Sequence, residues 1–319
     1  MIGMASSENS LPVRLIAIDL DGTLLGSDGQ VSLRNITVLK AAQAAGVQIV
    51  IATGRRHTYA LKVLRSLELP PHTLLVTSNG AVVRTVASEL IDRTHINRDE
   101  AIWLCGHLGE FRNGLVITFD KVGPGGEDTR GSLVIEELAD LHASIDPWMK
   151  ANEPYLALVK PIEDSLLEDV PVQMMLCGTL DRMRQVEEHL LASGKVSPVD
   201  EAHTSGLISL ARTETPTRDL AIVDILPAGC SKGAAVLRLA TERGILASQI
   251  MAIGDNWNDL SMLEIAGFPT LMANAPADLK NIAAERNWTL AGHHAADGVG
   301  NAVDDRLGLT ESAMLTTHA

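Results

Sequence analysis

The stretch IAIDLDGTLLGS, residues 16–27, decides the fold, because it runs from an apolar segment directly into two aspartates, Asp19 and Asp21. A short run of apolar and β-branched residues is typical of a buried strand. Two like charges at the mouth of such a strand repel each other unless something compensates them. The carboxyl end of this strand is therefore the first place to look for a functional site.

The segments after this strand alternate between helix and strand. The pattern predicts helices over residues 32–46, where Ser32 caps the first turn, and 57–69, and strands over 47–53 and 72–78. Beyond residue 230 the alternation returns, with helices over 231–244 and 258–267 and strands over 250–255 and 269–275. This rhythm predicts an α/β fold with a doubly wound, parallel, Rossmann-like sheet that carries helices on its faces.

Between these two halves the pattern changes. Residues 81–96 predict a hairpin, and the next segments mix helices over 98–112 and 179–192 with strands over 114–120, 172–177, 206–212 and 219–226. Such a mixture favours an α+β module with an antiparallel sheet. We therefore expect a discontinuous core domain, residues 1–84 and 227–319, interrupted by an inserted domain, residues 85–226. Within the insertion, VGPGGEDTRG, residues 122–131, predicts a flexible surface loop.

The bulk composition limits the classes of function. The chain has 319 residues, of which 46% are hydrophobic and 21% charged, as expected of a two-domain globular protein. Its formal charge of −14 argues against a nucleic-acid partner but allows a small anionic ligand. No apolar run approaches the roughly 20 residues of a membrane span. Three cysteines without metal spacing, and residues 1–12 without signal-peptide character, favour a cytoplasmic protein, either a monomer or a weak homo-oligomer.

Polar side chains recur where the predicted parallel strands end. They are Asp19 and Asp21 after the first strand, Thr53 after the second, Ser78 and Asn79 after the third, and Asp255, Asn258 and Asp259 after the late strand. Lys232 opens the helix before that late strand. Each alone is an ordinary helix cap or turn residue. Because the carboxyl ends of parallel strands share one edge, the recurrence predicts a single polar rim.

Four carboxylates on one rim require a cation. Oxygen ligands without histidine or cysteine indicate a hard ion, and Mg²⁺ is the usual one where a phosphate shares the site. An EF-hand over Asp19-x-Asp21-x-Thr23 is excluded because Leu24 occupies the sixth position, which must be glycine.

Four motifs in this sequence resemble those of the haloacid dehalogenase-like (HAD) superfamily. They are DLDGTLLGS, residues 19–27, ATGR, residues 52–55, Lys232 in SKGAAV, and GDNWNDLSML, residues 254–263. TSNGA, residues 77–81, and the large insertion after it are similar to the Cof-type subfamily with a type 2 cap. The resemblance implies a Mg²⁺-dependent phosphomonoester phosphatase that forms a phosphoaspartate. It implies as substrate a small phosphorylated metabolite, such as a sugar phosphate or the phosphate of a cofactor or its precursor.

The resemblance also implies roles for the acidic residues. Asp19 attacks phosphorus, and Asp21 first protonates the leaving alcohol and then accepts a proton from water. The metal is held by an oxygen of Asp19, the backbone carbonyl of Asp21 and the carboxylate of Asp255. Asp259 completes this metal-binding set by holding a water of the ion.

The remaining motif residues are implied to bind phosphate or substrate. Thr53, the Gly54 amide and Lys232 contact phosphoryl oxygens, and Leu20 lies in the turn whose amides approach the phosphate. Asn79 and Asn258 are positions of substrate contact. Arg55 is either a substrate contact or a salt-bridge partner. Trp257 stands where smaller residues are common, and it either covers the edge of the site or stacks on substrate.

Two alternatives remain open on sequence grounds. The same nucleophile serves phosphotransferases and phosphomutases, which pass the phosphoryl group to a sugar. A non-catalytic phosphate-binding module, similar to a receiver domain, also clusters aspartates on a doubly wound sheet, although it needs no insertion of this size. The insertion itself is expected to act as a lid, which favours small substrates.

Overall fold

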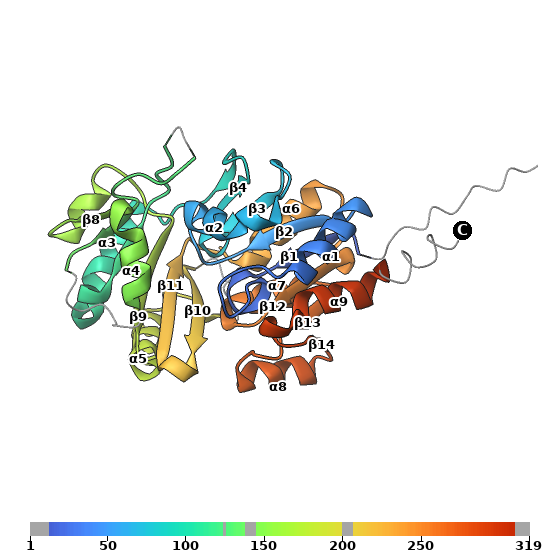
Figure 1. Cartoon of the computed structure of the whole chain (residues 1–319). Coiled ribbons are helices and arrows are strands. Elements are labelled where there is room, and N and C mark those ends of the chain that lie inside the picture. Colours follow the sequence, from blue (N-terminus) through green and yellow to red (C-terminus); the bar gives the residue numbers. More distant parts are fainter. Residues whose placement is uncertain (1–12, 124–125, 138–144, 200–206, 310–319) are drawn as a thin grey trace, which may run out of the picture.

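The computed structural model describes residues 13–123, 126–137, 145–199 and 207–309 (Figure 1). Residues 1–12, whose sequence lacks signal-peptide character, lie outside this part of the chain. Within the described residues the strands form two sheets, one of eight strands and one of six. None of the helices in these ranges is long and apolar enough to cross a membrane.

The larger sheet is mainly parallel. From one edge to the other its strands are β14 (Thr289–Leu290), β13 (Phe268–Leu271), β12 (Ile250–Gly254), β1 (Leu15–Ile18), β2 (Gln48–Ala52), β3 (Leu74–Thr77), β4 (Val82–Thr85) and β5 (Leu90–Arg93). The strands from β14 to β3 are parallel, and β4 and β5 add an antiparallel hairpin at the other edge. The parallel α/β core and the hairpin over residues 81–96 are as the sequence predicts.

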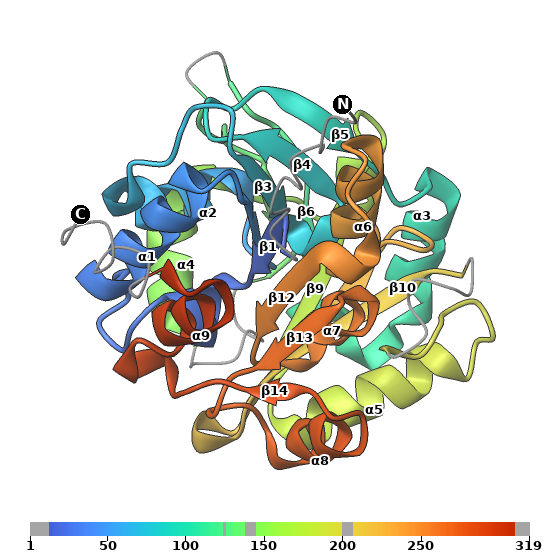
Figure 2. The same cartoon turned by 90° about the vertical axis from the view of Figure 1, so that its right-hand side faces the viewer.

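Helices cover both faces of this sheet, as Figure 2 shows. Ile16 and Ile18 of β1 face α1 (Leu33–Ala44), α2 (His57–Leu64) and α9 (Gly298–Leu307) in one apolar cluster. Leu15 and Ala17 face α6 (Lys232–Glu242), α7 (Leu260–Ile265) and α8 (Ala277–Glu285) in another. Because successive side chains of a strand point to opposite faces, the continuous apolar run is buried on both faces of the sheet. The helix α1 begins at Ser32, whose hydroxyl accepts from the Asn35 amide at 3.1 Å.

The smaller sheet belongs to the inserted segment. Its order is β10 (Ser209–Thr215), β11 (Leu220–Leu226), β9 (Gln173–Gly178), β6 (Val116–Thr118), β7 (Leu133–Ile135) and β8 (Leu156–Leu158). All neighbours are antiparallel except β7 and β8. Helices α3 (Arg98–His107) and α5 (Leu180–Leu191) pack on one face, and α4 (Asp146–Asn152) packs on the other. The fold is therefore a Rossmann-like core with an inserted α+β domain.

The two sheets meet at a small apolar cluster. It joins the start of the hairpin and the segment before α6 to the inserted sheet, through Ala81, Val82, Val172, Ala211, Leu226 and Cys230. The hairpin strand β5 pairs with β4 in the larger sheet, although it lies beyond residue 85, where the sequence placed the boundary. We propose that the chain divides where the sheets divide, after Arg93 and after Leu226.

Candidate active site

The turn after β1 wraps the chain around Asp19, which is buried. The amides of Leu24 and Leu25 donate to the carbonyls of Asp19 and Leu20 at 3.2 and 2.9 Å, and Gly22 adopts a positive φ of 76°. A Cβ on Gly22 would lie 2.5 Å from an oxygen of Asp255. Glycine is therefore required here both for the backbone conformation and for the close approach of a second carboxylate.

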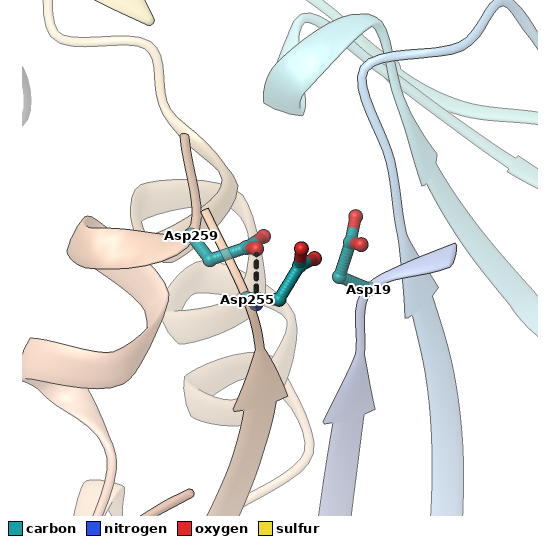
Figure 3. A group of neighbouring side chains, drawn as sticks. All are labelled: Asp19, Asp255 and Asp259. Atoms are coloured by element: carbon teal, nitrogen blue, oxygen red, sulfur yellow. Dashed lines mark hydrogen bonds between the residues drawn. The ribbon is translucent and has the colours of Figure 1, made fainter. Parts of the chain in front are cut away.

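Three buried aspartates converge at this edge of the sheet, as Figure 3 shows. Asp19 follows β1, Asp255 follows the neighbouring parallel strand β12, and Asp259 precedes α7. One oxygen of each lies within 4.8 Å of one oxygen of each of the others. The rim predicted from the ends of the strands therefore brings these three carboxylates together, as the rule for parallel sheets requires.

Lys232 is the cation of this cluster and is fully buried at the start of α6. Its Nζ donates to Oδ1 of Asp19 at 2.5 Å and to Oδ1 of Asp259 at 2.7 Å. Burial alone would lower the pKa of Lys232, but the charges of Asp19 and Asp259 outweigh it and raise the pKa above its ordinary value. The ammonium group therefore stays charged in this site.

One lysine does not compensate three carboxylates. Burial, and then the charge of Asp259, raises the pKa of Asp19 to about 7, even though Lys232 opposes the rise. Burial, and then the charges of Asp19 and Asp259, raises the pKa of Asp255 well above its usual range. The donors are hard oxygens at mutually close positions, and the charge is in excess. This set fits a hard divalent cation such as Mg²⁺.

The Asp255 and Asp259 side chains are held in different ways. Asp255 accepts from the Thr23 hydroxyl at 2.9 Å and from the Asn274 amide at 3.2 Å. Both oxygens of Asp259 are engaged by the protein, since Oδ2 accepts from the backbone amides of Asp255 and Asn256 at 3.0 and 3.1 Å while Oδ1 accepts from Lys232. Asp259 therefore orients both the lysine and the loop that carries Asp255.

The Asp21 carboxylate lies apart from the cluster and is half exposed, at 53% of its side-chain surface. Arg55 binds it through both donors, from Nη2 to Oδ1 at 2.5 Å and from Nε to Oδ2 at 2.7 Å. The Arg55 guanidinium also lies 4.6 Å from the centre of the Tyr59 ring. Of the two interpretations of Arg55, the structure shows the salt-bridge partner, and its partner is the proposed acid–base residue.

The predicted phosphate-binding positions form the next part of the rim. Thr53 is buried at the end of β2, and its hydroxyl accepts from the Arg55 amide at 3.1 Å. The fully buried Asn79 adopts a φ of 51°, and its amide group packs against Gly54, where a Cβ would lie 3.1 Å from Nδ2. Asn258 donates to Oδ1 of Asn79 at 3.1 Å. The side chain of Leu20 is buried in the apolar core.

Trp257 is contacted by the inserted domain. The guanidinium of Arg212, on β10, lies 4.6 Å from the centre of the Trp257 ring. Its neighbour Asn256 exchanges two hydrogen bonds with the backbone of Glu214, at 2.9 and 3.0 Å. The structure therefore places Trp257 at the junction between the core and the inserted sheet.

Two residues of the site were not singled out from the sequence. The Thr23 hydroxyl binds Asp255, and Asn274 donates both to Asp255 and to the Gly22 carbonyl, the latter at 2.7 Å. The signal was present for both, since Thr23 lies inside the deciding stretch and Asn274 follows the strand β13 at the same edge of the sheet. The rule that located the other rim residues also covers Asn274.

Comparisons with known proteins agree with this geometry. The model of a family described as haloacid dehalogenase-like hydrolase matches residues 16–303. The phosphatase YwpJ of Bacillus subtilis is 30% identical over 281 residues, which cover 85% of this chain and 93% of YwpJ. The 5-amino-6-(5-phospho-D-ribitylamino)uracil phosphatase YwtE of the same organism is 29% identical over 308 residues, covering 92% and 98%. The solved structure of the phosphatase BT1666 from Bacteroides thetaiotaomicron has the same fold, with a TM-score of 0.70 at 21% identity and coverage of 96% and 99%.

Proposed function

This chain belongs to the haloacid dehalogenase-like hydrolases of the Cof type and is a phosphomonoester hydrolase, and we propose that it cleaves a small phosphorylated metabolite through a phosphoaspartate on Asp19, with Mg²⁺ bound beside it. The observation that carries the proposal is the buried convergence of Asp19, Asp255 and Asp259 around Lys232. Acidic side chains in this number, with one compensating lysine, remain ionised together only if a further positive charge joins them.

In the first step, Oδ2 of Asp19 attacks phosphorus and the bond from phosphorus to the ester oxygen breaks. Lys232 holds Oδ1 at 2.5 Å, which favours the ionised form of the nucleophile and leaves the other oxygen to face the substrate. Asp21, in its protonated form, gives its proton to the departing alcohol. In the second step a water gives a proton back to Asp21 and attacks the phosphoaspartate, so that inorganic phosphate leaves and Asp19 is restored.

The remaining residues bind charge as it spreads over the phosphoryl oxygens. The Thr53 hydroxyl and the Gly54 amide contact these oxygens from one side, and the Lys232 ammonium faces them from the other. Mg²⁺ would be held by Asp19, the backbone carbonyl of Asp21 and the carboxylate of Asp255. When bound, it supplies the positive charge that offsets the phosphoryl group and the excess carboxylates. Arg55 holds the Asp21 carboxyl at the mouth of the site, where the leaving group departs.

The proposed substrate class follows from the inserted domain and from the relatives. The strand β10 of the inserted domain contacts the rim at Asn256 and Trp257, and a domain that covers the site favours a small substrate over a protein surface. The relative YwtE is named for a phosphorylated ribitylaminouracil. We therefore propose a phosphorylated sugar, or a phosphorylated cofactor or its precursor, as the substrate.

The test is release of inorganic phosphate from a panel of such esters, with Mg²⁺ and with a chelator. We expect activity only with the metal, and acid-quenched enzyme should carry one phosphoryl group that hydroxylamine removes. Asp19→Asn should abolish both signals. The matched control is Asp181→Asn, the same change at a side chain that is 86% exposed, and it should behave as the unchanged protein. Full turnover by Asp19→Asn would reject the mechanism. Transfer of phosphate to a sugar without release would favour the phosphotransferase.

A further inference from the structure

A buried carboxylate outside the four motifs lies between the two sheets. Asp224 is on β11, the strand that returns the chain from the inserted domain to the core, and it is only 4% exposed. Its neighbours Val223 and Ile225 point into the apolar core beneath α3 and α5. Because side chains alternate along a strand, Asp224 points to the opposite face. A charged group at this position needs a specific partner to be tolerated.

The partners of Asp224 come from both sides of the junction. Gln173, on the adjacent strand β9, donates through Nε2 to Oδ1 at 2.7 Å. Asn79, from the core, donates through Nδ2 to Oδ2 at 2.8 Å. The Asn79 side chain in turn accepts at Oδ1 from Nδ2 of Asn258, at 3.1 Å. The four side chains form one continuous chain of hydrogen bonds that runs from the inserted sheet to the loop bearing Asp255 and Asp259.

Asp224 determines which groups donate and which accept along this series of hydrogen bonds. An ionised carboxylate only accepts, so the amide of Asn79 must turn its NH₂ group toward Asp224 and its oxygen toward Asn258. The amide of Asn258 must then present its NH₂ group to Asn79, which leaves its own oxygen in a single direction. An asparagine amide by itself has two orientations of nearly equal shape. The carboxylate at position 224 removes that ambiguity for both asparagines.

Asn79 also holds the phosphate-binding turn. Its backbone amide donates to the Thr53 carbonyl at 3.0 Å, and its side chain packs against Gly54. A shift of Asn79 would therefore move both the turn proposed to bind phosphate and the amide of Asn258. Positional errors of about 1 Å in such groups can reduce turnover about 100-fold.

We propose that Asp224 is a positioning residue for hydrolysis, which acts through Asn79 to orient Asn258 and the Thr53–Gly54 turn, and which makes that orientation depend on the seating of the inserted domain. The inference rests on the proposed function, because Asn79 and Asn258 face substrate only if the rim is the active site. It goes beyond that function because Asp224 reaches the site only through Asn79 and has no hydrogen bond to Thr53, Gly54 or the acidic cluster.

The cost of keeping this acid supports the assignment. Burial raises the pKa of Asp224 to about 7, although hydrogen bonds from Gln173 and Asn79 and the charge of Lys232 act against the rise. A residue that served only to fill the junction would be more stable as a neutral side chain. A carboxylate, which only accepts hydrogen bonds when ionised, can fix the orientation of the Asn79 and Asn258 amides.

The test compares two changes at one position. Asp224→Leu removes the acceptor, and kcat/KM for the best substrate should fall about 10- to 100-fold. Asp224→Asn can present either its oxygen or its NH₂ group to Asn79, so it restores the orientation only in part, and kcat/KM should fall about 3- to 10-fold, less than in Asp224→Leu. Asp181→Leu is the matched control, because it makes the same change in the inserted domain at a side chain that is 86% exposed, and it should stay within about threefold of the unchanged protein.

A second measurement separates positioning from loss of fold. If Asp224 acts through Asn258, then Asn258→Ala and Asp224→Leu should divide their effects between kcat and KM in the same way. The double variant should also be no slower than the worse single variant. Additive losses, or an Asp224→Leu enzyme with normal kcat/KM, would overturn the inference. Where the leucine variant does not fold, Asp224→Ser is used, since its hydroxyl is too short to reach Asn79.

The proposed function is tested separately in the same assay. An inactive Asp19→Asn enzyme beside a normal Asp224→Leu enzyme would overturn the positioning role alone. An active Asp19→Asn enzyme would overturn the mechanism on which that role depends.

Discussion

Replacing Lys232 by methionine is the most direct test of how the acidic cluster is held together. Methionine is close to lysine in length but carries no charge, so Lys232→Met removes the ammonium without leaving a large cavity. In the unchanged protein, Nζ of Lys232 donates to Asp19 and Asp259 at 2.5 and 2.7 Å, and the lysine side chain is fully buried. After the change, three carboxylates lie within 4.8 Å of one another without this lysine.

The expected loss can be estimated from buried ion pairs. Removing one partner of such a pair lowers the free energy of unfolding by about 3–5 kcal/mol, because the other charge is left uncompensated. Lys232 serves two carboxylates, so we expect about 4 kcal/mol in metal-free protein at pH 8. The loss should be smaller at pH 5, where Asp19, whose pKa is already raised to about 7 by burial and Asp259, binds a proton in the folded protein.

Urea denaturation followed by circular dichroism measures this loss, with a chelator and with Mg²⁺. The metal should restore part of it, by about 2.7 kcal/mol at 100 times its dissociation constant, because an ion on the folded state replaces the missing charge. Turnover should remain about 10²- to 10³-fold lower, since a donor to the phosphoryl oxygens is gone. Lys40→Met is the matched control, because Lys40 forms an exposed pair with Glu68, and its denaturation curve should not change.

Two results would refute this reasoning. If Lys232→Met unfolds at the same urea concentration as the unchanged protein without metal, the three carboxylates do not depend on the lysine. If Mg²⁺ does not raise the urea midpoint of Lys232→Met, the ion does not join this cluster.

Three further predictions concern single residues of the rim and its support. Asp21→Asn should lower kcat about 10²- to 10⁴-fold, because proton transfer to the leaving group is lost. Isothermal titration with Mg²⁺ should meanwhile give an unchanged affinity, and a large loss of affinity would place the Asp21 carboxylate on the ion instead. Burial raises the pKa of Asp224 from 3.8 to about 7 in the folded protein, so the unchanged protein should lose about 4 kcal/mol of its free energy of unfolding as the pH rises from 4 to 7. The loss remains above pH 7. Asp224→Asn should not show this loss. Urea midpoints of both proteins at pH 5 and pH 8 measure this difference, and an equal change of the midpoint with pH in both proteins would contradict the raised pKa of Asp224. Gly22→Ala should abolish metal-dependent turnover, because its Cβ would lie 2.5 Å from an oxygen of Asp255 and the φ of 76° disfavours alanine; Gly29→Ala, at a φ of 73° with open space around it, is the control and should remain active.

The parallel core was predictable because its signals are local. The apolar run at residues 15–18, the Ser32 cap and the polar residues at strand ends each depend on a few neighbouring positions. The strands β7 and β8 and the helix α4 were missed, since each spans only three to seven residues. Segments of that length carry too few repeats of any period to be recognised, and their place is decided by packing against the rest of the inserted domain.

Partners that are distant in sequence were beyond prediction. The segment 122–131 was expected to be a flexible surface loop, but its Asp128 side chain is 4% exposed and pairs with Arg56, while its amide donates to the Thr58 hydroxyl at 2.8 Å. The expectation was wrong for Asp128 because these contacts span about seventy positions along the chain. The same holds for the site. The convergence of the strand ends was predictable from the sequence. The pairing of Arg55 with Asp21 and of Asn79 with Asp224 was not, because it depends on the tertiary arrangement alone.

The described contacts of the rim fall into two groups, those made to the inserted domain and those made to the core. The loops that carry the proposed phosphate- and substrate-binding positions are each tied to the inserted domain, through Arg56 to Asp128, Asn79 to Asp224, and Asn256 to Glu214. The turn with the proposed nucleophile Asp19 is held differently, since the hydrogen bonds of its described residues go to core positions such as Lys232, Asn274 and His294.

This division has a consequence for how the inserted domain can act on the site. A movement of the inserted domain would shift Arg56, Asn79 and the loop of Asn256, while the turn with Asp19 stays in place, because only the former are linked to that domain by these contacts. The loop of Asn256 also carries Asp255 and Asp259, and Asp259 accepts from the Asn256 amide. The distance between Asp19 and the other two carboxylates, on which metal binding depends, should therefore vary with the position of the inserted domain.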